Sequence, residues 1–225
     1  MTHEDEDEPP GSTVCFAQML VDGHVVDPQT WKDVSVFRKA ERTRLYAARQ
    51  EVLLEDRREM AARISARLME ILGDVTGRVI AVYWPIRGEL NLHPWMVDAS
   101  ERGAQICLPV VVEKNQPVEF HRWTSDSAMA KGIWNIPVPA DLGPVEPDVV
   151  IVPLLGVDEQ GFRLGNGGGY YDRTLARLPE DLMIIGVGHT FARMKTIFPM
   201  PWDIPMKKVV LGDGTSFDAP PKDGA

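Results

Sequence analysis

Cysteine is scarce in this sequence of 225 residues, where only Cys15 and Cys107 are present. Two cysteines so far apart cannot build the disulfide framework of a small secreted protein or a four-ligand zinc site. A chain of this length buries enough apolar surface to fold without such cross-links. We therefore expect two unpaired thiols in a reducing cytoplasm, and one large domain or two small ones.

Long apolar runs and an excess of positive charge are also missing. The longest apolar run, residues 149–155, is interrupted by Pro153 and falls far short of the roughly 20 residues of a membrane span. Acidic residues outnumber basic ones by 33 to 24, and five acids lie in the first eight positions, where a signal peptide would be basic. These absences argue against a membrane protein and remove any bulk electrostatic reason to bind nucleic acid.

The apolar pattern predicts an α/β fold. Residues 34–72 repeat apolar positions at helical spacing, which predicts two amphipathic helices broken near Glu55 and Asp56, and a further helix is expected at 92–102. Because near-continuous apolar strands alternate with helices, we expect a layered αβα arrangement around a mostly parallel central sheet. Short β-branched and aromatic runs predict its strands at 79–84, 105–112, 118–123 (an edge), 148–155 and 183–187.

Composition divides the chain into three parts. Residues 1–30 mix acids, prolines and isolated apolar positions, which predicts an acidic, irregular N-terminal arm. Residues 31–212 carry the periodic segments and are expected to form the α/β domain. Residues 213–225 are polar and rich in proline and glycine, which predicts a tail.

The most unusual segment, residues 161–173, reads GFRLGNGGGYYDR and lies between a predicted strand and a helix expected to start near Tyr170. Closely spaced glycines leave backbone amides open to a phosphate. Arg163 would add a positive charge, and Asp172 could hold a magnesium ion that bridges phosphates. The glycine spacing fits neither the dinucleotide fingerprint nor a Walker loop. On spacing alone, a flexible turn between strand and helix remains an equal alternative.

The run RLGNGGGYYDR resembles the RLGxGxGYYDR signature of the 5-formyltetrahydrofolate cyclo-ligase family, also called methenyltetrahydrofolate synthetases. This resemblance implies a cyclo-ligase-like α/β fold and the ATP- and magnesium-dependent conversion of 5-formyltetrahydrofolate to 5,10-methenyltetrahydrofolate, with release of ADP and phosphate. It covers roughly residues 34–211, and its other landmarks occur in the family's order: Phe37, Arg38, Arg44, 83–89, 134–137, 148–155, Gly186 and Asp203.

The resemblance also implies roles for individual residues. Arg163, Tyr170 and Asp172 would be catalytic, and Asp172 and Asp203 would bind magnesium. The residues expected to contact ATP are Arg38, Arg163, Leu164, Gly165, Asn166, Gly167, Gly168, Gly169, Tyr170 and Tyr171.

A reduced folate is the partner that the resemblance implies, with neither a membrane nor a nucleic acid expected. Glu89 would hold the pterin, because a buried carboxylate can accept hydrogen bonds from two adjacent N–H donors. Trp134 and Tyr170 would flank the folate, and Asn166 would contact it.

Four positions depart from the family's pattern. Val34 stands where a phosphate-gripping lysine is usual, and is expected to face the triphosphate. Asn91 replaces an acid, Trp202 replaces a histidine before the second metal-binding aspartate, and Ala192 replaces a glutamine.

These departures keep two alternatives open. One is a divergent paralogue that binds ATP and a pterin with different or no turnover. The other is a non-catalytic RNA-binding or regulatory module on the same fold, since residues 38–67 carry nine basic residues against five acids. The interspersed acids favour a solvated helix surface over an RNA-binding stripe.

Overall fold

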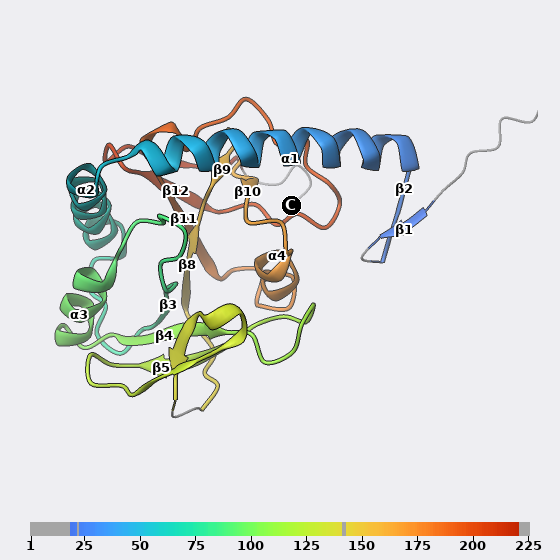
Figure 1. Cartoon of the computed structure of the whole chain (residues 1–225). Coiled ribbons are helices and arrows are strands. Elements are labelled where there is room, and N and C mark those ends of the chain that lie inside the picture. Colours follow the sequence, from blue (N-terminus) through green and yellow to red (C-terminus); the bar gives the residue numbers. More distant parts are fainter. Residues whose placement is uncertain (1–18, 22, 141–142, 221–225) are drawn as a thin grey trace, which may run out of the picture.

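The computed structural model describes residues 19–21, 23–140 and 143–220. It confirms the predicted mixed fold and the predicted order of helices and strands (Figure 1). The α-helices are α1 (Pro28–Glu51), α2 (Leu54–Leu72), α3 (His93–Glu101) and α4 (Tyr170–Leu175), and two short 3₁₀ turns are η1 (Ile133–Asn135) and η2 (Thr190–Ala192).

Seven strands form the central sheet in the order β13-β12-β11-β8-β3-β4-β5. The five inner strands run parallel, and the two edge strands, β13 and β5, run antiparallel to their neighbours. The edge position predicted for 118–123 is therefore confirmed. The sheet strands are β3 (Val79–Ala81), β4 (Gln105–Val110), β5 (Glu119–Trp123), β8 (Val149–Pro153), β11 (Met183–Gly188), β12 (Lys208–Leu211) and β13 (Ser216–Asp218).

Three two-stranded ribbons surround this sheet, and the sequence pattern did not predict them. Each pairs antiparallel strands of two or three residues, too short to show a period in the sequence. They are β1 (Met19–Val21) with β2 (His24–Val26), β6 (Met129–Lys131) with β7 (Pro137–Pro139), and β9 (Gly156–Val157) with β10 (Arg163–Leu164).

Apolar side chains cover both faces of the sheet. On one face, α2 and α3 pack Ile64, Leu68 and Trp95 against the strands, and on the other Leu175 of α4 joins a second buried cluster. Figure 1 shows α2 and α3 on one side of the sheet and α4 on the other. The strand β8, buried from Val149 to Val152, reads as continuously apolar because helices cover both of its faces.

The long helix α1 lies beyond the ends of β8 and its neighbours, along one side of the molecule (Figure 1). Its Leu45 is fully buried against Leu155 and Leu164, just after β8 and within β10. The helix ends at Glu51, slightly before the predicted break, because Val52 adopts an extended backbone. Glu55 and Asp56 lie instead in the first turn of α2, where acids favour the helix dipole.

The predicted boundaries differ from the structure at both ends. Residues 1–18 of the expected arm, Cys15 among them, lie outside the described residues. The helix α1 begins at Pro28, before the expected start of the helical pattern at 34 and of the domain at 31, because the Asp27 side chain accepts a hydrogen bond from the Thr30 amide. In the expected tail, β13 adds an antiparallel strand to the sheet, and residues 221–225 lie outside the described residues.

Candidate functional site

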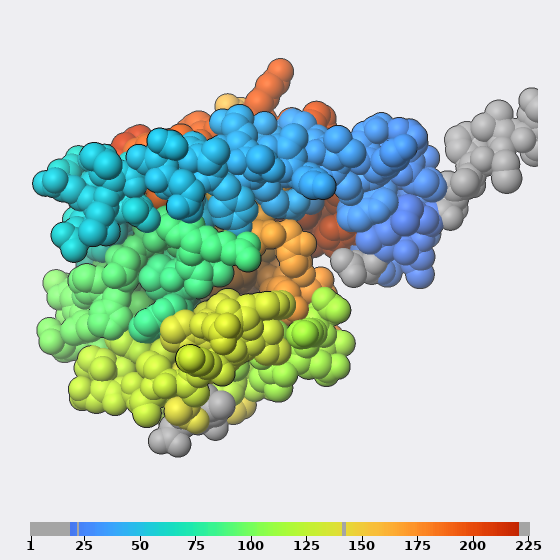
Figure 2. All heavy atoms as spheres, in the orientation of Figure 1, coloured from blue at the N-terminus to red at the C-terminus, as the bar shows by residue number. Residues whose placement is uncertain are grey.

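A cavity of about 980 Å³ opens between α1 and the ends of the central strands. Tyr83 follows β3, and Pro109 and Pro153 lie at the ends of β4 and β8, so that the carboxyl ends of three parallel strands line the cavity. This is the edge at which open α/β sheets bind their ligands. Figure 2 shows the recess between α1, in blue, and the yellow segment, with orange residues at its back.

The glycine-rich loop between β10 and α4 forms part of the cavity wall. Gly169 caps α4 with φ of +65°, a left-handed conformation that glycine adopts without strain. A Cβ atom at Gly165 would lie 2.2 Å from Nη1 of Arg163. Glycine at this position therefore makes room for the arginine side chain beside the open amides of the loop.

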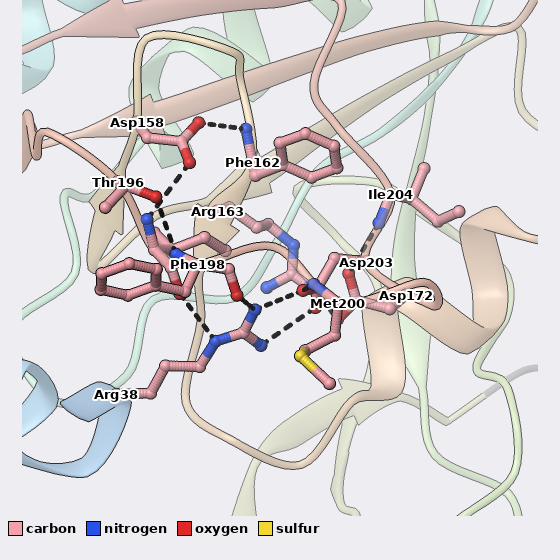
Figure 3. A network of polar contacts seen from close by, with 11 residues as sticks. Arg38, Asp158, Phe162, Arg163, Asp172, Thr196, Phe198, Met200, Asp203 and Ile204 are labelled. Atoms are coloured by element: carbon pink, nitrogen blue, oxygen red, sulfur yellow. Dashed lines mark hydrogen bonds and ion pairs between the residues drawn. The ribbon is translucent and has the colours of Figure 1, made fainter. Parts of the chain in front are cut away.

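Arg38, on α1, forms a buried ion pair with Asp203 (Figure 3). Its Nη1 donates to Oδ1 of Asp203 at 3.1 Å, its Nε to the carbonyl of Ile197 at 3.0 Å, and its Nη2 to the carbonyl of Phe198 at 2.8 Å. Asp203 also accepts a 2.6 Å hydrogen bond from the Met200 amide. These contacts hold both charges in fixed positions at the cavity wall.

A second ion pair joins Arg163 to Asp172 across 2.8 Å (Figure 3). The guanidinium of Arg163 also lies over the Tyr171 ring, 5.2 Å from its centroid, and the other oxygen of Asp172 accepts a 3.4 Å hydrogen bond from the Ile204 amide. The two predicted metal ligands, Asp172 and Asp203, therefore line one cavity, and each is paired with an arginine.

Arg42 is a cavity residue that the sequence interpretation missed. Its Nε donates a 2.9 Å hydrogen bond to the carbonyl of Gly165, which ties α1 to the glycine-rich loop. Burial and the nearby charge of Arg38 lower the pKa of Arg42. The signal was available, because residues four apart on a helix share a face and Arg38 had already been placed at the phosphates.

Nine of the ten residues predicted to contact ATP line the cavity. The exception is Leu164, whose side chain is 1% exposed and packs in a core cluster with Leu45 and Met194. The alternation of β10 explains the difference, since Arg163 and Leu164 point to opposite sides of the strand. The nine predicted residues that do line the cavity are Arg38, Arg163, Gly165, Asn166, Gly167, Gly168, Gly169, Tyr170 and Tyr171.

Glu89 also lines the cavity, in the loop after β3. Its Oε2 accepts a 3.0 Å hydrogen bond from the Ile86 amide. Burial raises the pKa of Glu89, while the charge of Arg49 and a hydrogen bond with Asn166 oppose that rise. Arg38 and Arg49 are eleven residues apart on α1, which corresponds to roughly 16 Å along the helix axis. Glu89 and Asp203 therefore mark two separate ends of the cavity.

Trp134 and Tyr170 form an aromatic wall. Their ring centroids are 5.4 Å apart in an edge-to-face arrangement. The Tyr170 hydroxyl accepts a 3.0 Å hydrogen bond from the Asn115 amide. Trp134 is 56% exposed and has φ of +57°, a rare conformation that turns a large apolar surface toward the cavity. Because more than half of this side chain is exposed, Trp134 does not serve as a core packing residue.

The departures from the family's pattern fall into different environments. Val34 does not face the cavity: it is buried among apolar side chains that include Val26 and Met200, which corrects the expectation that it faces a triphosphate. Asn91 accepts a 2.9 Å hydrogen bond from the His93 amide and so supports the start of α3. Ala192 is fully buried.

Comparison with known proteins agrees with this geometry. The sequence profile of the 5-formyltetrahydrofolate cyclo-ligase family matches residues 34–212. The 5-formyltetrahydrofolate cyclo-ligase of Escherichia coli strain K12 is 30% identical over 169 residues, which cover 72% of this chain and 93% of that protein. This chain belongs to the 5-formyltetrahydrofolate cyclo-ligase family. The resemblance seen in the RLGNGGGYYDR motif is thereby confirmed.

Solved structures of family members share the fold. The NMR structure of Aquifex aeolicus 5,10-methenyltetrahydrofolate synthetase matches with a TM-score of 0.70 and 26% identity, over 84% of this chain and 94% of that one. The 5,10-methenyltetrahydrofolate synthetase of Mycoplasma pneumoniae matches with a TM-score of 0.63 and 20% identity, over 77% and 96%. The cyclo-ligase family is a family of folate-processing ligases that are ATP-dependent in general.

Magnesium is the metal that the family resemblance implies. Across the described ranges, no group of three or more histidine, cysteine, aspartate or glutamate side chains is placed to hold a metal ion. Magnesium at a triphosphate needs no such group, because one or two carboxylates, substrate phosphates and water complete its coordination. Asp172 and Asp203 fit that requirement. None of the helices in the described part of the chain has the length and apolar character of a membrane span.

Proposed function

We propose that this chain catalyses the ATP-dependent cyclisation of 5-formyltetrahydrofolate to 5,10-methenyltetrahydrofolate. The observation that carries the proposal is a single cavity with two chemically distinct ends. One end has three arginines around a glycine-rich loop, which suits a triphosphate. The other has a buried carboxylate, and an aromatic wall also lines the cavity, which together suit a pterin with its N–H edge. Membership of the cyclo-ligase family supports the same reaction.

The reaction requires activation of a formamide. Its oxygen is a poor leaving group, so the γ-phosphoryl group of ATP is transferred to that oxygen and ADP remains. Nitrogen 10 of the folate then attacks the formyl carbon and loses its proton. The carbon–oxygen bond breaks, phosphate leaves, and the methenyl bridge remains between nitrogens 5 and 10. The protein must hold the two reactants together and exclude water that would hydrolyse the phosphorylated intermediate.

At the phosphate end, Arg38, Arg42 and Arg163 contact the triphosphate and neutralise its charge in the transition state. Asp203 holds Arg38 and Asp172 holds Arg163 in place before ATP arrives, as the two ion pairs indicate, and the Gly165 carbonyl holds Arg42. Magnesium would be held by the same two carboxylates together with the phosphates, and it would supply further charge neutralisation. Glycine amides contact phosphate oxygens that the arginines leave free.

At the folate end, the Glu89 carboxylate accepts hydrogen bonds from the pterin, and its buried position strengthens those bonds. Asn166 bridges the two ends, because it hydrogen-bonds Glu89 and lies within the glycine-rich loop. Trp134 and Tyr170 flank the folate and shield the reacting atoms from water. We propose a cytoplasmic enzyme, since the free thiol of Cys107 suits a reducing compartment.

An RNA-binding role gains no support from the basic residues of α1 and α2. Arg44 pairs with Glu41 and Arg63 with Glu59, each on its own helix surface. Arg38 is buried and directed into the cavity wall. Neighbouring acids therefore neutralise much of the charge that an RNA phosphate would need.

The proposed function is tested by incubating the purified protein with 5-formyltetrahydrofolate and Mg-ATP. We expect the near-ultraviolet absorbance of the methenyl product to grow together with one equivalent of ADP. Omission of ATP should abolish product formation. Binding of ATP and the folate without product or ADP would overturn the cyclo-ligase activity and leave a paralogue that binds both ligands.

A further inference from the structure

Three aromatic side chains gather at the rim of the cavity, outside the motif that identified the family. His24, Trp31 and Trp202 all line the cavity. The Trp31 and Trp202 ring centroids are 5.4 Å apart in an edge-to-face arrangement, and those of His24 and Trp202 are 6.1 Å apart. None of the three is buried, so their ring surfaces remain accessible to a ligand.

Two of these rings lie outside the residues that match the family model. The family match covers residues 34–212, whereas His24 lies in β2 and Trp31 in the first turn of α1. Trp202 lies inside the match. The contact therefore joins residues from outside and inside the family match.

An apolar cluster fastens this added segment to the family fold. Val26 at the end of β2 and Val34 on α1 are both 8% exposed and pack with Met200, and Trp31 and Trp202 lie against them. Val34, which was expected to face the triphosphate, thus serves here to anchor the hairpin.

The aromatic rings adjoin the phosphate end of the cavity. Trp202 precedes Asp203, the ion-pair partner of Arg38, and Trp31 lies seven residues before Arg38 on α1, two helical turns away. In a nucleoside triphosphate, the planar base is joined to the phosphates through a ribose. A base whose phosphates lie at Arg38 and Arg163 would therefore reach the rim, where aromatic rings can stack on it.

We infer that His24, Trp31 and Trp202 form the contact surface for the purine of ATP, so that a segment outside the family match completes the nucleotide site. This inference depends on the proposed function, because it requires the triphosphate at the glycine-rich loop. Stacking recognises the face of a base and not its edge. The surface therefore distinguishes a nucleotide from a bare polyphosphate, and it discriminates little between adenine and guanine.

The test compares Mg-ATP with Mg-tripolyphosphate, which carries the phosphates without the base, by calorimetry on the full chain. In the unchanged protein, ATP should bind at least tenfold more tightly than tripolyphosphate. Trp31→Leu keeps the apolar packing but removes the aromatic face. It should weaken ATP roughly tenfold to a hundredfold, the usual range for one base–aromatic stack, and leave tripolyphosphate within twofold. Trp31→Phe, which keeps a ring, should retain most of the ATP affinity.

Val25→Ala is the matched control, because Val25 lies in the same strand as His24, is 60% exposed and does not line the cavity. It should change neither affinity. Equal binding of ATP and tripolyphosphate to the unchanged protein, or an equal loss of both in Trp31→Leu, would overturn the purine contact and leave the phosphate site intact. Failure of the unchanged protein to bind either ligand would overturn the proposed function and this inference with it.

Discussion

The two ends of the cavity handle buried charge in opposite ways. At the phosphate end, Asp172 and Asp203 are each paired with an arginine, so the charges largely cancel before any ligand binds. At the folate end, Glu89 relies on one backbone amide and one side-chain amide, and burial raises its pKa. In the proposed binding mode, the phosphate end would exchange existing partners for the ligand, whereas the carboxylate at the folate end would gain partners that it lacks.

The arginines of α1 near the two ends also differ in their hydrogen-bond partners. Arg38 has protein partners for all three of its nitrogens. Arg49, 1% exposed near Glu89, donates from Nη2 to the Leu154 carbonyl at 2.7 Å, while its Nε and Nη1 have no hydrogen-bond partner among the described atoms. An unpaired buried cation costs stability, and its charge favours the ionised form of Glu89. The folate end therefore carries an electrostatic cost that the phosphate end, with its fully paired Arg38, does not carry.

The largest effect is expected from Asp172→Asn. The amide keeps the shape of the side chain but is a weaker partner for Arg163 and a weaker magnesium ligand. Turnover at saturating ligands should fall by about 10² to 10³, taking the loss of one electrostatic stabiliser as the scale. Asp218→Asn, which removes an exposed ion pair with Lys208 at the sheet edge, should leave turnover unchanged. Turnover of Asp172→Asn close to that of the unchanged protein would remove Asp172 from the site.

Glu89→Gln should act on one ligand only. A neutral amide cannot accept two hydrogen bonds from the pterin as the carboxylate does, so folate affinity should fall roughly tenfold to a hundredfold. ATP affinity should stay within twofold, because the phosphates lie at the other end. Separate calorimetric titrations with each ligand provide the measurement. An equal loss of both affinities would contradict the separation of the two ends.

The free energy of unfolding should depend on pH through His189, which is buried near Arg49 and Arg57. Burial, followed by the charges of Arg49 and Arg57, lowers the pKa of His189 to about 4. As the pH falls, the unfolded chain therefore binds a proton at His189 near the ordinary pKa of about 6.5. The folded protein binds that proton only at a lower pH. Stability that is fully present above that pH should be lost as the pH falls toward 4.

The size of this loss should be on the order of 2 kcal/mol. Urea unfolding of the unchanged protein and of His189→Gln at a series of pH values isolates the effect, because the variant lacks the titrating group. The difference between the two should change between pH 6.5 and 4. Parallel curves across this range would show that His189 does not carry the effect.

The smallest effect on ligand binding is expected at Val34. Because this side chain packs in an apolar cluster and not at the phosphates, Val34→Lys should leave ATP affinity within twofold. It should also lower the free energy of unfolding by about 3 kcal/mol, since buried apolar surface is lost and the ammonium gains no partner in the apolar cluster. Val34→Ile serves as the apolar control. A gain in ATP affinity with lysine would place Val34 at the phosphate end after all.

Sequence periodicity predicted the elements that are long or buried on both faces. The strand β8 and the helices α1 and α2 were found because their apolar patterns extend over many residues. The β1–β2 hairpin was not found, because three-residue strands show no period and acidic residues precede them. Its position depends on contacts with Val34 and Met200, which lie far away in the sequence.

The candidate site was predictable where a motif fixed the residues in one segment. The glycine-rich loop, Arg163 and Asp172 lie within eleven positions, and the structure places them together in the cavity wall. The proposed purine surface was not predictable, because His24 and Trp31 lie far from Trp202 in the sequence and only the fold brings the three rings together. Arg42 lies between these cases, since its helical spacing from Arg38 was visible but the motif did not include it.

We expect ATP and the folate to occupy opposite ends of one cavity at the same time. Calorimetric titration of 5-formyltetrahydrofolate into protein saturated with a non-hydrolysable ATP analogue and magnesium tests this expectation most directly. The folate should bind with an affinity equal to or greater than that measured without the analogue. Competition, in which the apparent folate affinity falls in proportion to the analogue concentration, would contradict the account.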